Sequence, residues 1–88
     1  MLNTYIAKIY VTLKPTVNDP QGKTILGGLK SLGYEDVLDV RAGKYIQVRF
    51  SSEHQNKASE FVEKMCLDLL ANTVIENYSY DIDIISSE

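Results

Sequence analysis

The chain has 88 residues, of which 44 % are hydrophobic and 24 % are charged, and its formal net charge is −3. This composition is typical of one small folded domain over residues 1–88 with a thin core. The negative charge argues against nucleic acid or an anionic membrane as the primary partner. A single cysteine, Cys66, and the lack of a long apolar run or a signal-peptide pattern predict a cytoplasmic protein without disulfides.

The N-terminal part of the chain predicts a strand and then a helix. Residues 5–13 alternate, so we expect a strand whose odd-numbered side chains face a core. Asp19 can cap the following helix, and Pro20 suits the first helical position because no N–H is needed there. Gly33 should end the helix in a Schellman turn with Tyr34 folded back. The apolar stripe of this helix is Ile25, Leu26, Leu29 and Leu32.

The connection between this strand and helix is richer in constraining residues than a simple link requires. Residues 13–25 read LKPTVNDPQGKTI. Pro15, Asp19 and Pro20 should stiffen the turn, and a rigid turn can present its backbone to a partner at low ordering cost. The simpler interpretation is a well-made helix start. Gly27-Gly28 leaves a similar choice open between tolerance by the helix and close approach of a neighbouring backbone.

A hairpin is expected in the middle of the chain. Residues 38–42 and 45–50 alternate, and Gly43-Lys44 is placed to turn the chain between them. Ser52 and Gln55 then have the spacing of a capping box, which predicts the start of a second helix.

The second helix has the clearest helical spacing in the sequence. Asn72 can adopt the left-handed conformation that would stop this helix. Residues 78–84 alternate again and predict a last strand. The apolar stripe of the helix is Ala58, Phe61, Val62, Met65, Cys66, Leu69 and Leu70.

The order strand, helix, strand, strand, helix, strand predicts an α+β fold of the ferredoxin-like split βαβ type. This fold is a four-stranded antiparallel sheet with both helices on one face. The other face would be bare, and a bare face on a thin core favours association with another subunit, although a solvated surface is the simpler interpretation. The outward positions include Ile6, Tyr10, Asp39, Arg41, Tyr45 and Arg49.

Catalytic and metal-binding patterns are missing from the sequence. His54 is expected to be exposed at a helix start, and Cys66 to be a buried, inert thiol in an apolar stripe. One histidine and one cysteine cannot supply a structural zinc site. Asp81 and Asp83 share one strand face and could bind a cation, but a solubilising edge is the simpler interpretation.

Three segments, VTLKPTVNDPQGK, SLGYEDVLDVRAGKYIQV and MCLDLLANTVIENY, together resemble the PurS family, the small subunit of phosphoribosylformylglycinamidine synthase. The resemblance runs from Tyr10 to Tyr80, and the combination of motifs is specific although each alone is weak. Thr16 stands where the family usually has Gly, Thr73 where it usually has Pro, and Gly27-Gly28 replaces bulkier residues. These departures lie in loops and in a helix interior and leave the core pattern unchanged.

The resemblance implies a small subunit with no catalytic, cofactor or metal site of its own. Its expected partners are itself, as a homodimer or higher oligomer, a glutaminase subunit and a large synthetase subunit that uses ATP and Mg²⁺. The implied complex is a carbon–nitrogen ligase of purine biosynthesis, which converts formylglycinamide ribonucleotide to formylglycinamidine ribonucleotide with glutamine as nitrogen donor. We expect the partner interface to include Pro15, Asp19, Pro20, Ile6, Tyr10, Arg41, Tyr45 and Arg49.

Two other classes of function compete with this one. Ligand-sensing domains of the same shape also dimerise, so a small-molecule-binding regulatory module would show metabolite binding by the isolated protein. A nucleic-acid-binding module would show salt-dependent binding to RNA.

Overall fold

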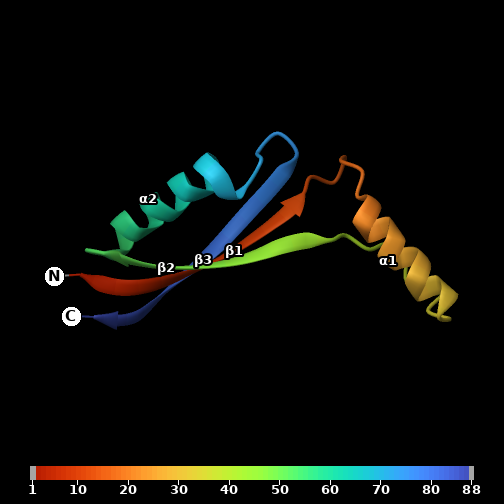
Figure 1. The fold of residues 1–88 in the computed structure, drawn as a ribbon, viewed down its shortest axis with the longest axis horizontal. Helices are drawn as coiled ribbons and strands as arrows, with labels where there is room; N and C mark the ends of the chain where they lie inside the picture. Colours follow the sequence, from red (N-terminus) through yellow and green to blue (C-terminus); the bar gives the residue numbers. More distant parts are fainter. Residues whose placement is uncertain (1, 88) are drawn as a thin grey trace.

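The computed structural model describes residues 2–87 and has an α+β fold, as expected. Its three strands form an antiparallel sheet in the order β2-β1-β3, with β1 in the centre (Figure 1). The elements in chain order are β1 (Asn3–Leu13), α1 (Pro20–Ser31), β2 (Gly43–Ser52), α2 (Gln55–Met65), the π-helical turn η1 (Cys66–Leu70) and β3 (Glu76–Ser87).

The core lies between α2 and one face of the sheet. The odd-numbered side chains of β1 point to this face, which confirms the prediction from alternation. Ile9 and Val62 meet there with no exposed surface, and Cys66 is equally buried. Burying each such aliphatic side chain contributes about 1.5–3 kcal/mol to folding. Partly buried residues of β2 and β3 complete the core: Ile46, Val48, Phe50, Tyr78, Tyr80 and Ile82.

The predicted fourth strand, residues 38–42, does not form. This segment is irregular and leads directly into β2, of which Gly43 is the first residue rather than part of a turn. Gly43 pairs with Thr12, and a Cβ atom on Gly43 would lie only 2.6 Å from the carbonyl oxygen of Val11. The predicted hairpin was therefore wrong, because glycine serves close strand pairing here and not a reversal. The outer edge of β2 stays unpaired within the described chain.

The prediction that both helices cover one sheet face was also wrong. Only α2 covers the sheet, whereas α1 lies beyond its end (Figure 1). The radius of gyration is 17.1 Å, against about 12 Å for a compact domain of this length. The segment between β1 and β2, residues 14–42, is therefore an arm that extends from the sheet, and we refer to it as the arm.

The ends of α1 confirm the sequence prediction. Asp19 is the N-cap and Pro20 is the first helical residue. Gly33 has a positive φ of 98°, which glycine adopts without strain. The N–H of Tyr34 donates to the carbonyl oxygen of Leu29 at 3.0 Å, which is the contact that defines a Schellman turn.

The ends of the second helix differ from the prediction. Ser52 is the buried last residue of β2, so the expected capping box does not exist. His54 is the N-cap instead, and its Nδ1 accepts a hydrogen bond from the N–H of Lys57 at 3.2 Å. Asn72 does not adopt the left-handed conformation, because Gly33 is the one position with positive φ in residues 2–87. The helical segment instead continues as η1 and ends at Leu70, because Ala71 is extended.

Candidate interaction surfaces

A buried carboxylate joins the two ends of the arm next to the sheet. Asp19 is only 3 % exposed. Its Oδ1 accepts from the N–H of Gly22 at 2.9 Å, which caps α1, and its Oδ2 accepts from the N–H of Ala42 at 2.7 Å. These two bonds, and more weakly the charge of Arg41, hold the pKa of Asp19 below its usual value. One side chain therefore joins the outgoing and returning segments of the arm.

Arg41 makes a second connection between the same two segments. Its guanidinium donates to the carbonyl oxygens of Lys14 at 2.9 Å and Val17 at 3.0 Å. A third contact excludes any side chain, since a Cβ atom on Gly22 would lie 2.3 Å from the carbonyl oxygen of Val40. Asp19, Gly22 and Arg41 together form what we call the hinge lock.

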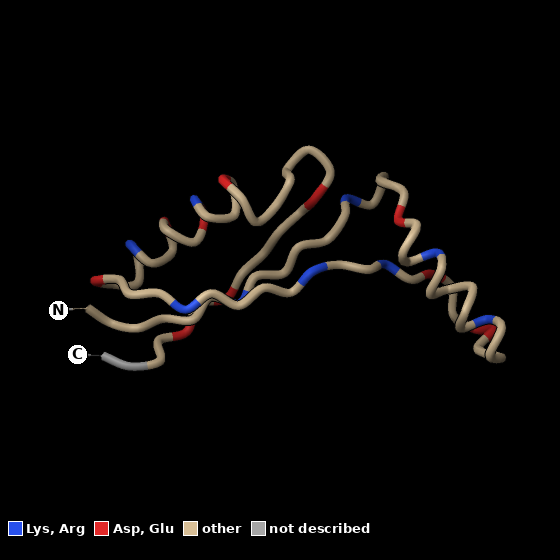
Figure 2. The backbone as a smooth tube through the Cα atoms, viewed as in Figure 1, with Lys and Arg blue, Asp and Glu red and all other residues tan. Residues whose placement is uncertain are grey.

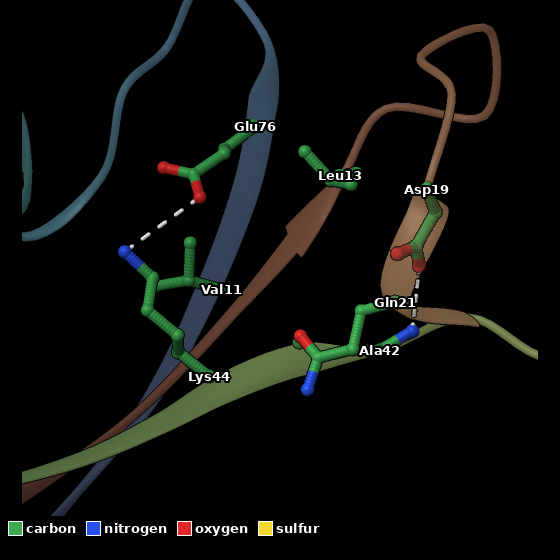
Figure 3. Close-up of a pocket in the computed structure, with 8 residues that line it drawn as sticks. Val11, Leu13, Asp19, Gln21, Ala42, Lys44 and Glu76 are labelled. Carbon is green, nitrogen blue, oxygen red and sulfur yellow. Dashed lines mark hydrogen bonds and ion pairs between the residues drawn. The ribbon is translucent and has the colours of Figure 1, made fainter. Parts of the chain in front are cut away.

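A pocket of about 300 Å³ lies where the arm meets the sheet (Figure 3). The carboxylate of Asp19 and the side chain of Gln21 approach it from the arm. On the opposite side Lys44 and Glu76 form an ion pair with their charged atoms 3.6 Å apart, across Val11. Glu76 also accepts from the N–H of Asn72 at 2.6 Å, so its carboxylate is committed to holding the start of β3. The complete lining is Val11, Leu13, Asp19, Gln21, Ala42, Gly43, Lys44 and Glu76.

The sheet face opposite α2 carries an ordered set of side chains, and we call it the bare face. Tyr10 and Tyr45 are directly paired across β1 and β2, and their rings stack with centroids 5.2 Å apart. The amide of Gln47 donates to the hydroxyl of Tyr45 at 2.8 Å. Lys8 and Asp83 form an ion pair at 3.3 Å across β1 and β3. Because this ion pair is exposed, it contributes little to stability.

The arm exposes apolar side chains that no part of the described chain covers. Leu38 is 90 % exposed, Leu32 is 77 % exposed and Tyr34 is 59 % exposed. Ile25 in the middle of α1 is also exposed. Figure 2 shows charged residues spaced along the arm, so this surface combines apolar and charged positions. An apolar stripe on a helix that touches no sheet is typical of an interface.

A carboxylate–tyrosine cluster between α2 and β3 was not anticipated from the sequence. Glu63 accepts from the hydroxyl of Tyr78 at 2.5 Å and from that of Tyr80 at 2.8 Å. The bond to Glu63 raises the pKa of Tyr78 to about 12 and lowers the pKa of Glu63. The helical position of Glu63 beside Val62 was the available signal, because a polar residue flanking a core stripe can reach the hydroxyls of core tyrosines.

The predicted interface residues fall into two groups. Arg41 was expected on the bare face, but the structure places it at the hinge lock, near the start of α1. Asp39 also lies off the sheet and accepts from the N–H of Val40. His54 is exposed and Cys66 is buried, both as predicted, and burial raises the pKa of the Cys66 thiol. The hinge group is Pro15, Asp19, Pro20 and Arg41, and the bare-face group is Ile6, Tyr10, Tyr45 and Arg49.

Residues 2–87 bring together no group of three or more side chains that could hold a metal ion. No helix in this range is long and apolar enough to cross a membrane.

Comparison with known proteins identifies the family. Residues 6–84 match the family model described as PurS, phosphoribosylformylglycinamidine (FGAM) synthase. The chain belongs to the PurS family. It is 48 % identical over 82 residues to the phosphoribosylformylglycinamidine synthase subunit PurS of Synechocystis, which covers 93 % of this chain and 82 % of that protein.

Solved structures of PurS proteins share the fold. The chain matches Bacillus subtilis PurS with a TM-score of 0.81 at 43 % identity, over 90 % of this chain and 98 % of the other. It matches a chain of the PurLQS structure from Thermotoga maritima with a TM-score of 0.80 at 33 % identity, over 93 % and 98 % of the two chains. A three-stranded PurS fold with an extended α1 is therefore the arrangement that this sequence specifies.

The two PurS motifs at the two ends of the arm lie next to each other in the structure. Asp19 and Gly22 belong to the segment KPTVNDPQG, and Arg41 and Gly43 belong to the segment VRAGKY. The hinge lock joins the first segment to the second through the Asp19 carboxylate and the Arg41 guanidinium. The motifs that carry the resemblance in the sequence thus have a common structural role.

Proposed function

We propose that this chain is the non-catalytic small subunit of phosphoribosylformylglycinamidine synthase and holds a glutaminase subunit and an ATP-dependent synthetase subunit together. Membership of the PurS family over residues 6–84 carries this proposal. The complex makes formylglycinamidine ribonucleotide for purine biosynthesis in the cytoplasm, and its ATP and Mg²⁺ belong to the synthetase subunit. The small subunit contributes geometry rather than chemistry.

A second copy of the chain is the first partner that we propose. Each chain has one helix, α1, that covers no sheet, and two sheet edges, the outer edges of β2 and β3, that pair with nothing in the described chain. Two copies related by a two-fold axis can exchange these features, since each arm can supply a helix and an extended segment to the other sheet. This exchange would bury Leu32 and Leu38, which water now surrounds.

The bare face is the surface that we propose for the larger subunits. Its central aromatic pair, Tyr10 and Tyr45, is already stacked, so binding would order few side chains. Arg49 and Ile6 lie next to each other in the β1–β2 register. Tyr and Arg at the centre of an interface often carry much of the binding energy. The arm and the bare face would then serve different partners.

The bridging role has a physical reason. Ammonia released by a glutaminase is lost to solvent unless the synthetase active site is close to its source. Holding two subunits together raises the effective concentration of one at the other without any change in their own chemistry. A small rigid subunit suffices for this task.

The test compares two nitrogen sources. Product formation by the glutaminase and synthetase subunits is measured with and without this protein, first with glutamine and then with a high concentration of ammonium salt. We expect omission to abolish most glutamine-dependent synthesis and to spare ammonium-dependent synthesis. Equal glutamine-dependent turnover without the protein would overturn the bridging role and favour a regulatory module.

The bare face is tested with the same subunits, by measuring how tightly this protein captures them. Tyr45→Ala removes the stacked partner of Tyr10 at an exposed position, and Lys64→Ala is a control at an exposed position of α2, which covers the opposite face of the sheet. We expect Tyr45→Ala to weaken capture of a larger subunit at least about tenfold, as for an interface hot spot. Wild-type capture by Tyr45→Ala would assign binding to another surface.

A further inference from the structure

The same arm could in principle take either of two positions. Residues 38–42 alternate like a strand that would join the chain's own sheet. The apolar stripe of α1 is that of a helix that would cover this sheet. In the structure neither does so, and α1 lies beyond the end of the sheet (Figure 1). Something other than these two patterns must therefore decide between a closed chain and an open one.

We infer that the hinge lock, in which Asp19, Gly22 and Arg41 join the two segments of the arm next to the sheet, keeps the arm open and so directs it to a second copy. This inference rests on the pairing of two copies proposed above. It makes the three residues positioning residues for assembly, although none of them needs to touch the partner.

The lock opposes closure because its contacts exist only in the open form. A chain that turned back at Gly43 would carry Ala42 along the outer edge of β2. The N–H of Ala42 would then leave the Asp19 carboxylate, from which it now lies 2.7 Å away. Arg41 would likewise lose the carbonyl oxygens of Lys14 and Val17. Losing a donor to a buried carboxylate is unfavourable.

The close packing between the two segments of the arm also favours the open form. Gly22 packs against the carbonyl oxygen of Val40 so closely that no Cβ atom could lie between them. Pro15 and Pro20 restrict the backbone on the outgoing side. The two segments therefore meet as a short, stiff hinge, and hinges of this kind favour exchange of elements between copies over closure within one chain.

The energetic balance requires a lock. A helix tethered to its own sheet has a much higher effective concentration there than on a separate molecule. Without a structural restraint, closure within one chain would win at ordinary protein concentrations. The exposed Leu38 and Leu32 show how much apolar surface the open arm keeps available for a second chain.

The experiment measures the dimer dissociation constant by sedimentation of lock variants. Asp19→Asn keeps an acceptor for the N–H of Gly22 but places an amide N–H group where the N–H of Ala42 needs an acceptor. Arg41→Lys keeps the charge but shortens the side chain, so the ammonium cannot take the place of Nη2, which donates to both carbonyl oxygens. The controls are Asp68→Asn and Lys64→Arg, which make the same acid-to-amide change and the reverse cation exchange at exposed positions of η1 and α2, away from the hinge and from the bare face.

We expect both lock variants to raise the dissociation constant at least about tenfold, while the controls leave it unchanged. Circular dichroism verifies that each variant keeps its helices. A further variant with two glycines inserted between Ala42 and Gly43 should be a compact single chain, since the insertion supplies the missing turn. Lock variants that dimerise like wild type, or an insertion variant that stays dimeric, would overturn the inference.

The outcome for the lock is separable from that for the proposed pairing. If the wild-type protein sediments as one chain at micromolar concentration, the pairing fails and small-angle scattering tests the lock. An extended wild type, near the observed radius of 17.1 Å, with compact lock variants would support the lock. Equal radii of gyration for the wild type and the lock variants would overturn the inference.

Discussion

Gly22→Ala tests the close contact inside the hinge lock. The new Cβ atom would lie 2.3 Å from the carbonyl oxygen of Val40 and 2.8 Å from Oδ2 of Asp19. The carbonyl oxygen of Val40 belongs to the backbone and Oδ2 of Asp19 is held by the N–H of Ala42, so the backbone must shift. Overpacking of this kind costs about 1–3 kcal/mol, and the stiffer unfolded chain returns about 0.4–1 kcal/mol.

The net expectation for Gly22→Ala is a loss of about 1–2 kcal/mol in the free energy of unfolding. For a domain of this size the melting temperature should fall by roughly 5–15 °C. Thermal unfolding followed by circular dichroism measures it, at one fixed protein concentration because association shifts the transition.

Two glycines on the same helix provide the control. A Cβ atom on Gly27 or Gly28 meets nothing within 4 Å in the chain. Gly27 lies opposite the apolar stripe, so Gly27→Ala should stabilise the helix by about 0.5–1 kcal/mol. Gly28 lies beside the stripe. Gly28→Ala should stabilise the helix in the same way if the helix merely tolerates this glycine, and should weaken association if a second copy approaches the helix closely there. A Gly22→Ala protein as stable as wild type would refute the reasoning.

Three further changes test single features of the fold. Cys66→Ala should cost about 1–2 kcal/mol through lost packing, measured by urea unfolding, without loss of synthesis by the complex. His54→Ala removes the acceptor for the N–H of Lys57 and should cost about 0.5–1 kcal/mol in the same assay, again with full turnover. Because its pKa is raised to about 12, the Tyr78 hydroxyl stabilises the fold below about pH 10 and loses this effect as the pH rises through about 12. Tyr78→Phe should therefore be less stable than wild type at neutral pH, with the difference shrinking in alkali, and a constant difference up to pH 12 would contradict the role of Glu63.

Local patterns in the sequence were sufficient for most of the elements. Alternation placed β1 and β3 and assigned the odd-numbered side chains of β1 to the core, because a strand has a strict period of two. The cap at Asp19 and the Schellman turn at Gly33 were also predictable, because both depend on residues within one or two helical turns. The combination of motifs identified the family.

The path of residues 38–42 was beyond the reach of local patterns. An alternating segment before a Gly-Lys pair reads the same whether the chain reverses or continues. What decides the path is the contact of Gly43 with β1, together with the bonds from Asp19 and Arg41 across more than twenty residues of sequence. The misplaced α1 follows from the same contacts.

Amino-acid sequence alone therefore determined most of the strands and helices, which of their faces are apolar and which family the chain belongs to. Tertiary structure decided where the arm goes, and with it which apolar surface remains for a partner. The physical reason is that periodicity records the burial of a residue without recording what buries it. For α1 and Leu38 the described chain supplies no cover, and the bonds at the hinge hold both away from their own sheet.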